Sequence, residues 1–404
     1  MKHSLVARFA ATALGACILG GANAQDYFIV NLANPAQTYT VAASHNLTVV
    51  DRTIGAPFAY FRSPVGSNHD VVLNALKADT RVVWAEDDSS IESPENQSGG
   101  KGSTVAVVND RNTLYGLNSG ALNKISFDPV RAALPGRAVK IAILDTGLAR
   151  RSFSIWRRVV KGANFVEPGH SAYDDYNQTD SNGNNIVDEG VGHGTFVAGI
   201  IDQVAPQCPL VIVRIADSDG VSSAWKLIKG IVLATTEGCE VANVSLGSPV
   251  HIAALSDVCE WAQLRGLTIV GAAGNLNVQG AFWPSRISDN VCVSGVDAID
   301  KKAAFANWDS GISTSAPSTG IKSAWVDGTT VVWQGTSFAA PFVTGAIGDS
   351  LRRRGRAYPS DVARVSGKAG DGINAINPSY RGKLGVRLNL TKLDNSLKNL
   401  PVRP

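Results

Sequence analysis

The sequence predicts an α/β domain with a mostly parallel sheet, preceded by a smaller α+β unit. Beyond about residue 138, short and nearly continuous apolar runs alternate with amphipathic stretches of helical length. Such runs are typical of parallel strands covered by helices on both faces. Before about residue 92, short strand-like runs surround one helical segment. A chain of 404 residues is long enough for both parts.

The first 24 residues have the pattern of an export signal. The segment opens with a basic region that begins at Lys2. The apolar stretch Phe9–Ile18 follows, and Ala22–Ala24 is a small-residue cleavage site. The stretch is shorter than the roughly 20 residues that a membrane-spanning helix needs, as is every later apolar run. We expect a signal peptide at 1–24 and a secreted or periplasmic protein without a transmembrane segment.

A second interpretation of this segment is a lipid anchor. Leu14-Gly-Ala-Cys17 resembles the lipobox of bacterial lipoproteins, in which the cysteine carries the lipid. The small-residue site at Ala22–Ala24 favours release instead, so anchoring through Cys17 is the minor alternative.

The α+β unit comes next and is followed by a linker. We expect a helix at Asp70–Ala78 and strands at Tyr27–Val30, Leu47–Val50, Phe58–Phe61 and Arg81–Ala85. Ser89–Ser103 is polar, with Pro94 and three glycines near its end, as in an exposed linker. The chain is therefore divided into a domain at 25–98 and a larger one at 99–404.

In the larger domain, strands and helices alternate. The predicted strands are Ala138–Leu144, Leu210–Ile215, Val241–Leu246, Leu267–Ala273 and Val291–Val296. The predicted helices are Thr195–Gln203, Ala224–Thr236, Ile252–Arg265 and Ser337–Arg353. In such sheets ligands bind beyond the carboxyl ends of the strands.

Four cysteines remain after removal of the signal: Cys208, Cys239, Cys259 and Cys292. An even count in an exported protein permits disulfides. Cys208 and Cys239 each precede an apolar run, so adjacent strands could bring them together and leave Cys259 with Cys292. The alternative is four buried free thiols. Without a Cys-x-x-Cys pair, a cysteine metal site is not expected.

The net charge is +3, and no basic block with interleaved aromatic residues occurs. Charge therefore gives no reason to expect a nucleic-acid partner.

Asp145 stands at the carboxyl end of the first apolar run of the larger domain. A carboxylate in that place is costly unless it serves a partner. Taken alone, however, it also fits an ordinary helix-cap or turn aspartate, because Thr-Gly follows.

Three further residues could complete a site for nucleophilic catalysis. His193 lies between Gly192 and Gly194 at the start of an apolar helix, where close backbone packing leaves the imidazole in a cleft. Ser337 opens another helix, and helix N-termini favour developing negative charge. Asn275 follows a buried strand and could donate its amide to an oxyanion. Each also has a structural explanation, namely an incidental turn histidine, a serine N-cap and a turn asparagine.

Together, the four motifs resemble those of the subtilase family in order and in flanking residues. They are Asp145-Thr-Gly, Gly192-His-Gly-Thr-Phe-Val-Ala-Gly, Ala272-Ala-Gly-Asn275 and Gly335-Thr-Ser-Phe-Ala-Ala-Pro341. The order Asp, His, Ser is the one known for subtilisin. The resemblance covers about residues 138–397 and implies a subtilisin-like fold, with helices flanking a mostly parallel sheet.

The resemblance also implies roles and partners. Ser337 would attack the scissile carbonyl, His193 would transfer its proton, and Asp145 would orient the imidazole. Asn275 and the Ser337 backbone N–H would bind the oxyanion. Protein or peptide substrates would pair by strand addition with two chain edges. These edges consist of Gly220, Val221, Ser222, Ser245, Leu246 and Gly247.

The resemblance makes 25–98 an inhibitory propeptide with a ferredoxin-like α+β fold. Such a segment assists folding and then blocks the cleft, so we expect a zymogen that cuts itself within Ser89–Ser103 and acts as a monomer. The alternative is a permanent accessory domain.

The chain departs from the usual family pattern at Phe196, Phe338 and Phe342, where histidine, methionine and histidine are common. None belongs to the catalytic set. No cofactor is required, and the loop that binds calcium tightly in well-known members is missing. A weaker calcium candidate consists of Asp180, Asn182, Asn184 and Asp188, whose side-chain oxygens suit a hard cation.

Two other function classes could use a serine or a cleft of this kind. A lipase or esterase would need Gly-x-Ser-x-Gly and a histidine after the serine, but the motif ends in Ala339 and no histidine follows Ser337. A catalytically silent peptide-binding protein would use the same cleft. Because all four catalytic positions are filled, the sequence favours the enzyme.

Overall fold

The computed structural model describes residues 25–94, 104–105 and 111–403. The predicted signal peptide, Cys17 and most of the predicted linker lie outside these ranges. The described chain forms two compact units. One contains the chain up to Arg52 together with Ala59–Asp87, and the other contains Thr53–Phe58 and Asp88–Pro404.

The smaller unit is a four-stranded sheet with two helices, in the order βαββαβ. Its elements are β1 (Tyr27–Leu32), α1 (Thr38–Ser44), β2 (Thr48–Arg52), β3 (Phe58–Arg62), α2 (His69–Ala78) and β4 (Val82–Asp87). The strand order β2-β3-β1-β4 gives a ferredoxin-like arrangement. Phe28, Phe61 and Leu76 are fully buried between the layers. Helix α1 was not predicted, because β-branched and aromatic residues in Thr-Tyr-Thr-Val favour strands.

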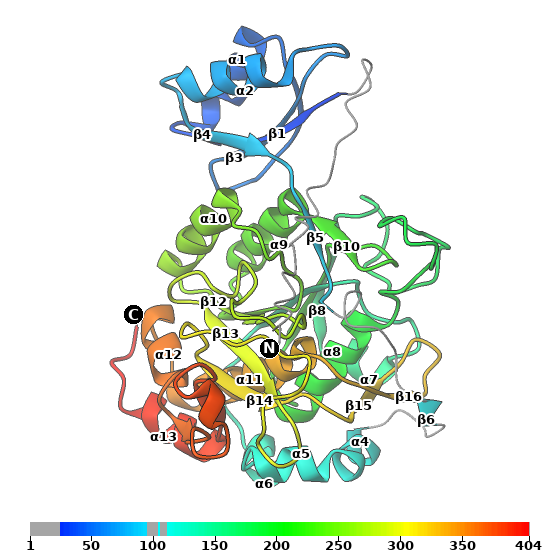
Figure 1. The fold of residues 1–404 in the computed structure, drawn as a ribbon, viewed down its shortest axis with the longest axis vertical. Coiled ribbons are helices and arrows are strands. Elements are labelled where there is room, and N and C mark those ends of the chain that lie inside the picture. Colours follow the sequence, from blue (N-terminus) through cyan, green and yellow to red (C-terminus); the bar gives the residue numbers. More distant parts are fainter. Residues whose placement is uncertain (1–24, 95–103, 106–110, 404) are drawn as a thin grey trace, which may run out of the picture. The chain divides into compact units, whose positions relative to one another are not determined.

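The larger unit is built on a nine-stranded sheet in the order β17-β18-β14-β13-β12-β11-β7-β9-β8 (Figure 1). Its strands are β7 (Ile141–Asp145), β8 (Val159–Asn164), β9 (Leu210–Arg214), β11 (Val241–Val244), β12 (Thr268–Ala272), β13 (Val291–Val296), β14 (Thr314–Pro317), β17 (Gly370–Asp371) and β18 (Val386–Leu388). The pairs of neighbouring strands in this sheet are parallel, except that of β17 with β18. The predicted α/β fold with a mostly parallel sheet is therefore confirmed.

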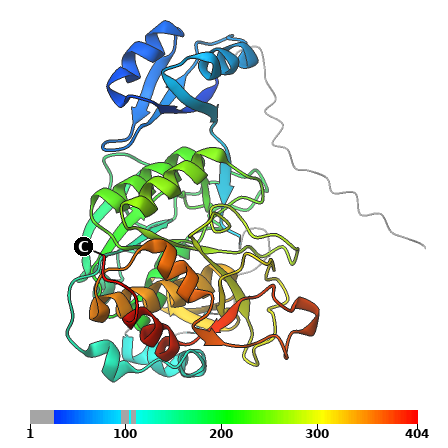
Figure 2. The ribbon, with the colours of Figure 1, turned by 90° about the vertical axis from the view of Figure 1, so that its left-hand side faces the viewer.

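Helices cover both faces of this sheet. Helices α9 (Ala224–Thr236) and α10 (Ala253–Leu264) pack together against β7, β9 and β12. Helices α8 (His193–Val204) and α11 (Thr336–Arg354) pack together and contact β7 and β11 to β14. Figure 2 shows the green helices α9 and α10 on one side of the sheet and the orange helix α11 on the other. All residues of α8 are buried, which explains the apolar run Phe196–Ile201 in its middle.

Shorter elements complete the larger unit. They are β5 (Ser90–Glu92), β6 (Thr104–Val105), α4 (Arg111–Leu117), α5 (Ser119–Lys124), α6 (Pro129–Ala133), α7 (Phe153–Trp156), β10 (Val221–Ser223), β15 (Ile321–Ala324), β16 (Thr330–Trp333), α12 (Pro359–Ser366) and α13 (Leu390–Lys398). One of them matters for function: β5, from the predicted linker, pairs antiparallel with β10.

The predicted disulfides are wrong for this structure. Cys208, Cys239, Cys259 and Cys292 are all free and buried. Cys208 and Cys239 precede β9 and β11, but β7 lies between these two strands. Strands two positions apart are about 9.6 Å from each other, whereas a disulfide needs Cα atoms within about 7 Å. Cys292 instead contacts the Ser285 hydroxyl, with 3.4 Å between Sγ and Oγ.

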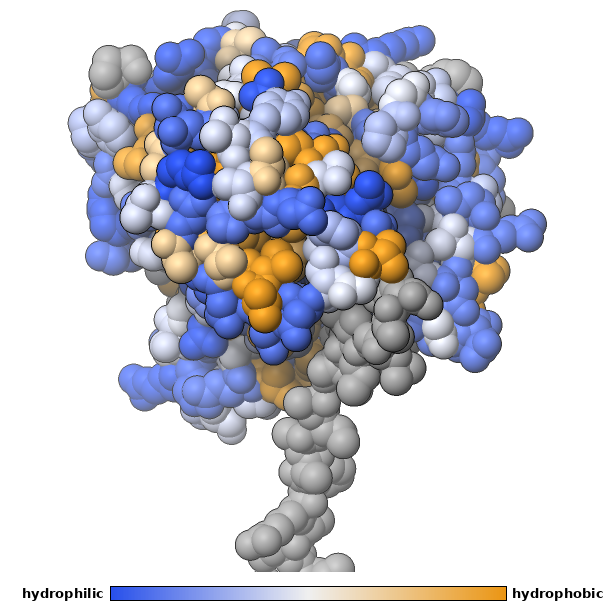
Figure 3. Space-filling model, turned by 90° about the horizontal axis from the view of Figure 1, so that it is seen from above, coloured by the Kyte–Doolittle hydropathy of each residue, from blue (hydrophilic) through white to orange (hydrophobic). Residues whose placement is uncertain are grey.

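Hydrophilic side chains predominate on the face shown in Figure 3, where apolar residues occur in small separate patches. Among the described residues, no helix combines the length and the apolar character needed to cross a bilayer.

Candidate active site

Asp145 and His193 form a buried pair at the carboxyl edge of the parallel sheet. Asp145 is the last residue of β7 and His193 the first of α8. His193 Nδ1 lies 2.7 Å from Asp145 Oδ1, and both side chains are fully buried. The Thr146 backbone N–H donates to the same oxygen, at 2.8 Å. A carboxylate held in this way fixes the orientation of the imidazole.

The glycines beside His193 are required by space and by conformation. Gly192 has φ of +86°, a value that L side chains rarely adopt. A Cβ on Gly194 would lie 2.4 Å from the Gly147 carbonyl oxygen and 3.1 Å from Asp145 Cβ. The Thr146 hydroxyl also accepts a hydrogen bond from the Gly194 N–H. The two motifs therefore interlock through their backbones.

A second buried carboxylate, Asp174, holds the first turn of α8. It accepts hydrogen bonds from the Gly192 N–H at 3.0 Å, the Thr195 N–H at 3.1 Å and the Thr195 hydroxyl at 2.6 Å. Burial raises the pKa of Asp174, while these three donors oppose the rise. Sequence reasoning missed this residue, because it lies in a loop without periodic pattern.

Ser337 lies in the first turn of α11, where Ser245 supports it. Pro341 has no N–H, so it cannot donate to the Ser337 carbonyl one helical turn earlier. The Ser245 hydroxyl supplies that hydrogen bond at 3.0 Å, and Ser337 Oγ donates to the Ser245 carbonyl at 3.1 Å. Asn243 in turn donates to Ser245 Oγ. The serine motif and the predicted substrate edge are thus directly bonded.

Asn275 is oriented by the residue before Ser337. Its side-chain oxygen accepts from the Thr336 N–H and the Thr336 hydroxyl, both at 2.9 Å. The same hydroxyl accepts from the Gly274 N–H. Because the oxygen is engaged by Thr336, the donor face of the amide is turned away from that residue.

The four predicted catalytic residues therefore belong to one site. Asp145 bonds to His193, and Asn275 bonds to the residue preceding Ser337. The ring of Phe338, which follows Ser337, lies 5.4 Å from the imidazole ring, centroid to centroid. A base with its orienting anion, a hydroxyl at a helix start and an oriented amide are the parts that acyl transfer needs.

Aromatic side chains pack around the imidazole, and two of them, Phe196 and Phe338, stand at positions that depart from the usual family pattern. The rings of Phe196 and Phe338 lie 4.4 Å apart, and Trp333 is 4.9 Å from Phe338. Trp333 also meets the His193 ring edge-on at 5.8 Å. These contacts exclude water from one side of the imidazole.

The two predicted substrate edges hold a strand of the chain itself. Strand β5 pairs with β10 so that Val221 is opposite Glu92 and Ser222 opposite Ile91. On the other side, Glu92 and Gly247 exchange two backbone hydrogen bonds, at 3.2 and 3.0 Å. The Ile91 side chain is 1% exposed.

The calcium candidate loop is bonded internally. Asp180 accepts from the N–H groups of Asn184 and Asn185, and Asp188 from those of Asn177, Gln178 and Thr179. Asn182 and Asn184 donate to Glu189. Within the described residues, no group of three or more His, Cys, Asp or Glu side chains is arranged to hold a metal.

A family model described as "Subtilase family" matches residues 136–366. Alkaline serine exoprotease A of Vibrio alginolyticus is 30% identical over 76% of the chain, which spans 55% of that protein's length. Subtilisin BL of Lederbergia lenta is 32% identical over 53% of the chain and 76% of its own length.

Two solved structures are similar. Fervidolysin from Fervidobacterium pennivorans, described as a keratinolytic enzyme related to subtilisin, has a TM-score of 0.74 and 18% identity, over 95% of this chain and 62% of its own. That identity supports likeness of fold alone. A cold-adapted subtilisin-like serine proteinase has a TM-score of 0.57 and 28% identity, over 67% of this chain and 97% of its own.

Proposed function

The chain belongs to the subtilase family of serine endopeptidases, and on this premise we propose that it hydrolyses peptide bonds through an acyl-enzyme on Ser337. The observation that carries the proposal is the buried Asp145–His193 hydrogen bond, at the same site as Ser337 and Asn275. A histidine–carboxylate hydrogen bond of that kind, deeply buried at the same site as a serine at a helix start, suits a general base better than a purely structural role.

The mechanism begins when Ser337 Oγ attacks the scissile carbonyl carbon and His193 takes the hydroxyl proton. Asp145 keeps Nδ1 as the protonated nitrogen, so that Nε2 is the basic one. The tetrahedral oxyanion is bound by the Asn275 amide and the Ser337 backbone N–H. His193 then gives its proton to the leaving amine, which leaves the acyl group on Ser337. In the second half of the reaction, water takes the place of the amine: His193 removes its proton as it attacks the acyl carbon, and then returns that proton to Ser337 Oγ as the acyl group is released.

A phosphonylating reagent for activated serines tests this assignment. The processed enzyme should take up one equivalent, mapped by peptide mass analysis to Ser337. A Ser350→Ala variant, which removes another buried hydroxyl of α11, should label as the parent does. Label on any other serine, or undiminished label in Ser337→Ala, would refute the role of Ser337.

We further propose that the chain is an autoinhibited zymogen of a secreted or periplasmic protease. The pairing of β5 with β10 and with Gly247 supports this, because the chain's own strand occupies the edges where an extended substrate would bind. Continuing the register of the antiparallel bridge between Glu92 and Gly247 would bring Pro94 opposite Ser245, whose carbonyl accepts from Ser337 Oγ. We therefore expect self-cleavage next to Pro94.

Intact-mass analysis of the active enzyme tests the cut. Its N-terminus should fall within Ser89–Ser103, close to Pro94. An active enzyme that still begins at Gln25 would exclude processing.

The inhibitory contact has its own test. Glu92→Pro removes the N–H that bonds to Gly247, so the lag before the purified precursor hydrolyses casein should shorten. Glu92→Gln keeps that backbone bond and should keep the lag.

A further inference from the structure

Asn307 is a fully buried asparagine in the chain between β13 and β14 whose side chain is saturated by backbone groups. Its side-chain oxygen accepts from the N–H groups of Leu276 and Val278, at 2.9 and 3.3 Å. Its side-chain nitrogen donates to the carbonyls of Ala273 and Gly280, at 3.2 and 3.0 Å. A single carboxamide thus satisfies four backbone groups of one loop.

That loop carries Asn275. It begins directly after β12 and runs through Gly280, and its backbone returns to the Asn307 segment at several points. The Asn307 N–H donates to the Gly274 carbonyl at 3.0 Å, and the Asn277 N–H donates to Phe305 at 2.7 Å. A Cβ on Gly274, which has φ of +105°, would lie 2.6 Å from Asn307 Nδ2. The backbone on both sides of Asn275 is therefore fixed against Asn307.

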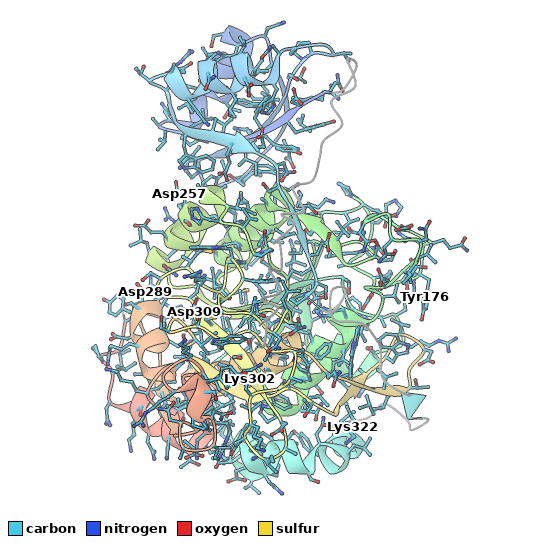
Figure 4. All side chains as sticks on the ribbon, viewed as in Figure 1. Tyr176, Asp257, Asp289, Lys302, Asp309 and Lys322 are labelled. Carbon is cyan, nitrogen blue, oxygen red and sulfur yellow. The ribbon has the colours of Figure 1, made fainter. Side chains whose placement is uncertain are left out.

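Lys302 ties the same two segments together at the rim. The side chain, labelled in Figure 4, donates from Nζ to Asn277 Oδ1 at 2.8 Å and to the carbonyls of Ala303 and Ala306 at 2.9 and 2.8 Å. Unlike Lys302, Asn307 is wholly enclosed, so its bonds do not compete with water.

We propose that Asn307 is a positioning residue for the oxyanion donor, acting through the backbone of the Asn275 loop. Thr336 orients the Asn275 carboxamide from one side, and Asn307 fixes the chain that carries it from the other. An oxyanion donor stabilises the transition state only when it is held at hydrogen-bond distance from the place where negative charge develops. This inference rests on the proposed function of Asn275.

The backbone groups around the Asn307 side chain make aspartate an informative substitution. Asn307→Asp has nearly the same shape, but it replaces the two donors to Ala273 and Gly280 by an oxygen that repels both carbonyls. The loop should shift and Asn275 with it. We expect kcat to fall about 100-fold per titrated active site, as for the loss of one oxyanion donor, with KM changing less than about threefold.

A double-mutant cycle separates positioning from general destabilisation. In an Asn275→Ala background the donor is already lost, so adding Asn307→Asp should lower kcat by less than about threefold. An equal fold-loss in both backgrounds, or an unchanged kcat in the single variant, would overturn the proposal.

Asn118→Asp is the matched control. Asn118 is another buried carboxamide, before α5; it donates to the Lys322 carbonyl and to Gln203 Oε1 and accepts from the Lys322 N–H. Its replacement should lower the melting temperature and leave kcat near the parental value. A 100-fold fall in kcat here would mean that any buried asparagine gives the effect, and would overturn the assignment.

A second variant and a second measurement cover the cases in which Asn307→Asp does not fold or matures slowly. Where Asn307→Asp does not fold, Asn307→Ser retains one donor and should give a smaller fall with the same dependence on Asn275. Where a variant matures slowly, the first-order rate of self-cleavage replaces kcat. If the parent itself has no activity, the proposed function fails, which differs from a failure confined to Asn307.

Discussion

At the scale of single residues, the site depends on polar groups that are buried and fully bonded. Asp174 is the strongest case outside the catalytic set, because one carboxylate satisfies three donors of Gly192 and Thr195, on either side of His193. A buried polar group of this kind lowers the free energy of unfolding little when each of its hydrogen bonds is made, and much when one of them is lost.

Asp174→Asn should therefore lower the free energy of unfolding by about 1–3 kcal/mol, because the amide nitrogen cannot accept from the Gly192 or Thr195 N–H. Chemical denaturation in an inactive Ser337→Ala background measures it. Asp175→Asn is the control, since Asp175 pairs with a largely exposed Arg150 and should cost about 0–1 kcal/mol. Equal losses in the two variants would contradict this role of Asp174.

The cysteines give a second prediction at this scale. Burial raises the pKa of the Cys208, Cys239, Cys259 and Cys292 thiols to about 12, so almost no thiolate exists near neutral pH. Iodoacetamide at pH 8 should leave all four unmodified in the native protein and alkylate all four after denaturation without reductant. A cysteine that stays unmodified after denaturation would reveal a disulfide.

At the scale of secondary-structure elements, α8 and α11 bring His193 and Ser337 into one site by close packing. Gly345 of α11 lies at their contact, where a Cβ would be 2.8 Å from Val204 Cβ. Helices that approach through a glycine cannot accept a methyl group without moving apart.

Gly345→Ala should cost about 1–3 kcal/mol of stability and reduce activity, because the two helices separate. Thermal unfolding and the rate of casein hydrolysis measure these effects. Gly120→Ala, in α5 with open space around its Cβ position, should be neutral or slightly stabilising. A neutral Gly345→Ala would mean that this helix contact is not tight.

At the scale of the whole molecule, arginine–carboxylate pairs join the C-terminal helix to the rest of the larger unit. Asp394 of α13 lies 2.7 Å from Arg131 and 2.5 Å from Arg354. Burial raises the pKa of Asp394, but the hydrogen bond from Arg354 and the neighbouring arginine charges outweigh it and hold that pKa below its usual value. A lowered carboxyl pKa stabilises the fold above about pH 4, and this stabilisation is lost as the pH falls through the folded-state pKa.

Asp394→Asn should therefore lower the unfolding free energy at pH 7 by on the order of 3 kcal/mol, and the difference from the parent should shrink below about pH 4. Denaturation curves at several pH values, again with Ser337→Ala, test this. Asp361→Asn removes an exposed pair with Arg364 and should change little at any pH. A difference that persists unchanged in acid would contradict the charge argument.

The sequence was sufficient to predict the strands whose hydrophobic pattern is local. Strands β7, β9, β11, β12 and β13 are buried on both faces, so each lies in a nearly continuous apolar run. Strand β8 lies at the sheet edge with exposed residues, and β14 contains a proline, so neither has such a run.

Contacts between distant parts of the chain could not be predicted. The order of strands in the sheet has no sequence signal, which is why the pairing of Cys208 with Cys239 failed. Asp174 lies in a loop 18 residues before its partner Gly192, and Asn307 lies in another loop 32 residues after Asn275. The order and spacing of the motifs were enough to propose the four catalytic residues. They gave no indication of the residues that hold these four in position.

The most direct test of the proposed function compares the purified precursor with its Ser337→Ala variant on a gel and on casein. We predict that the parent loses the mass of its N-terminal segment and digests casein, while the variant stays whole and inert. If both behave alike, Ser337 is not the nucleophile, and the cleft is better explained as a peptide-binding site.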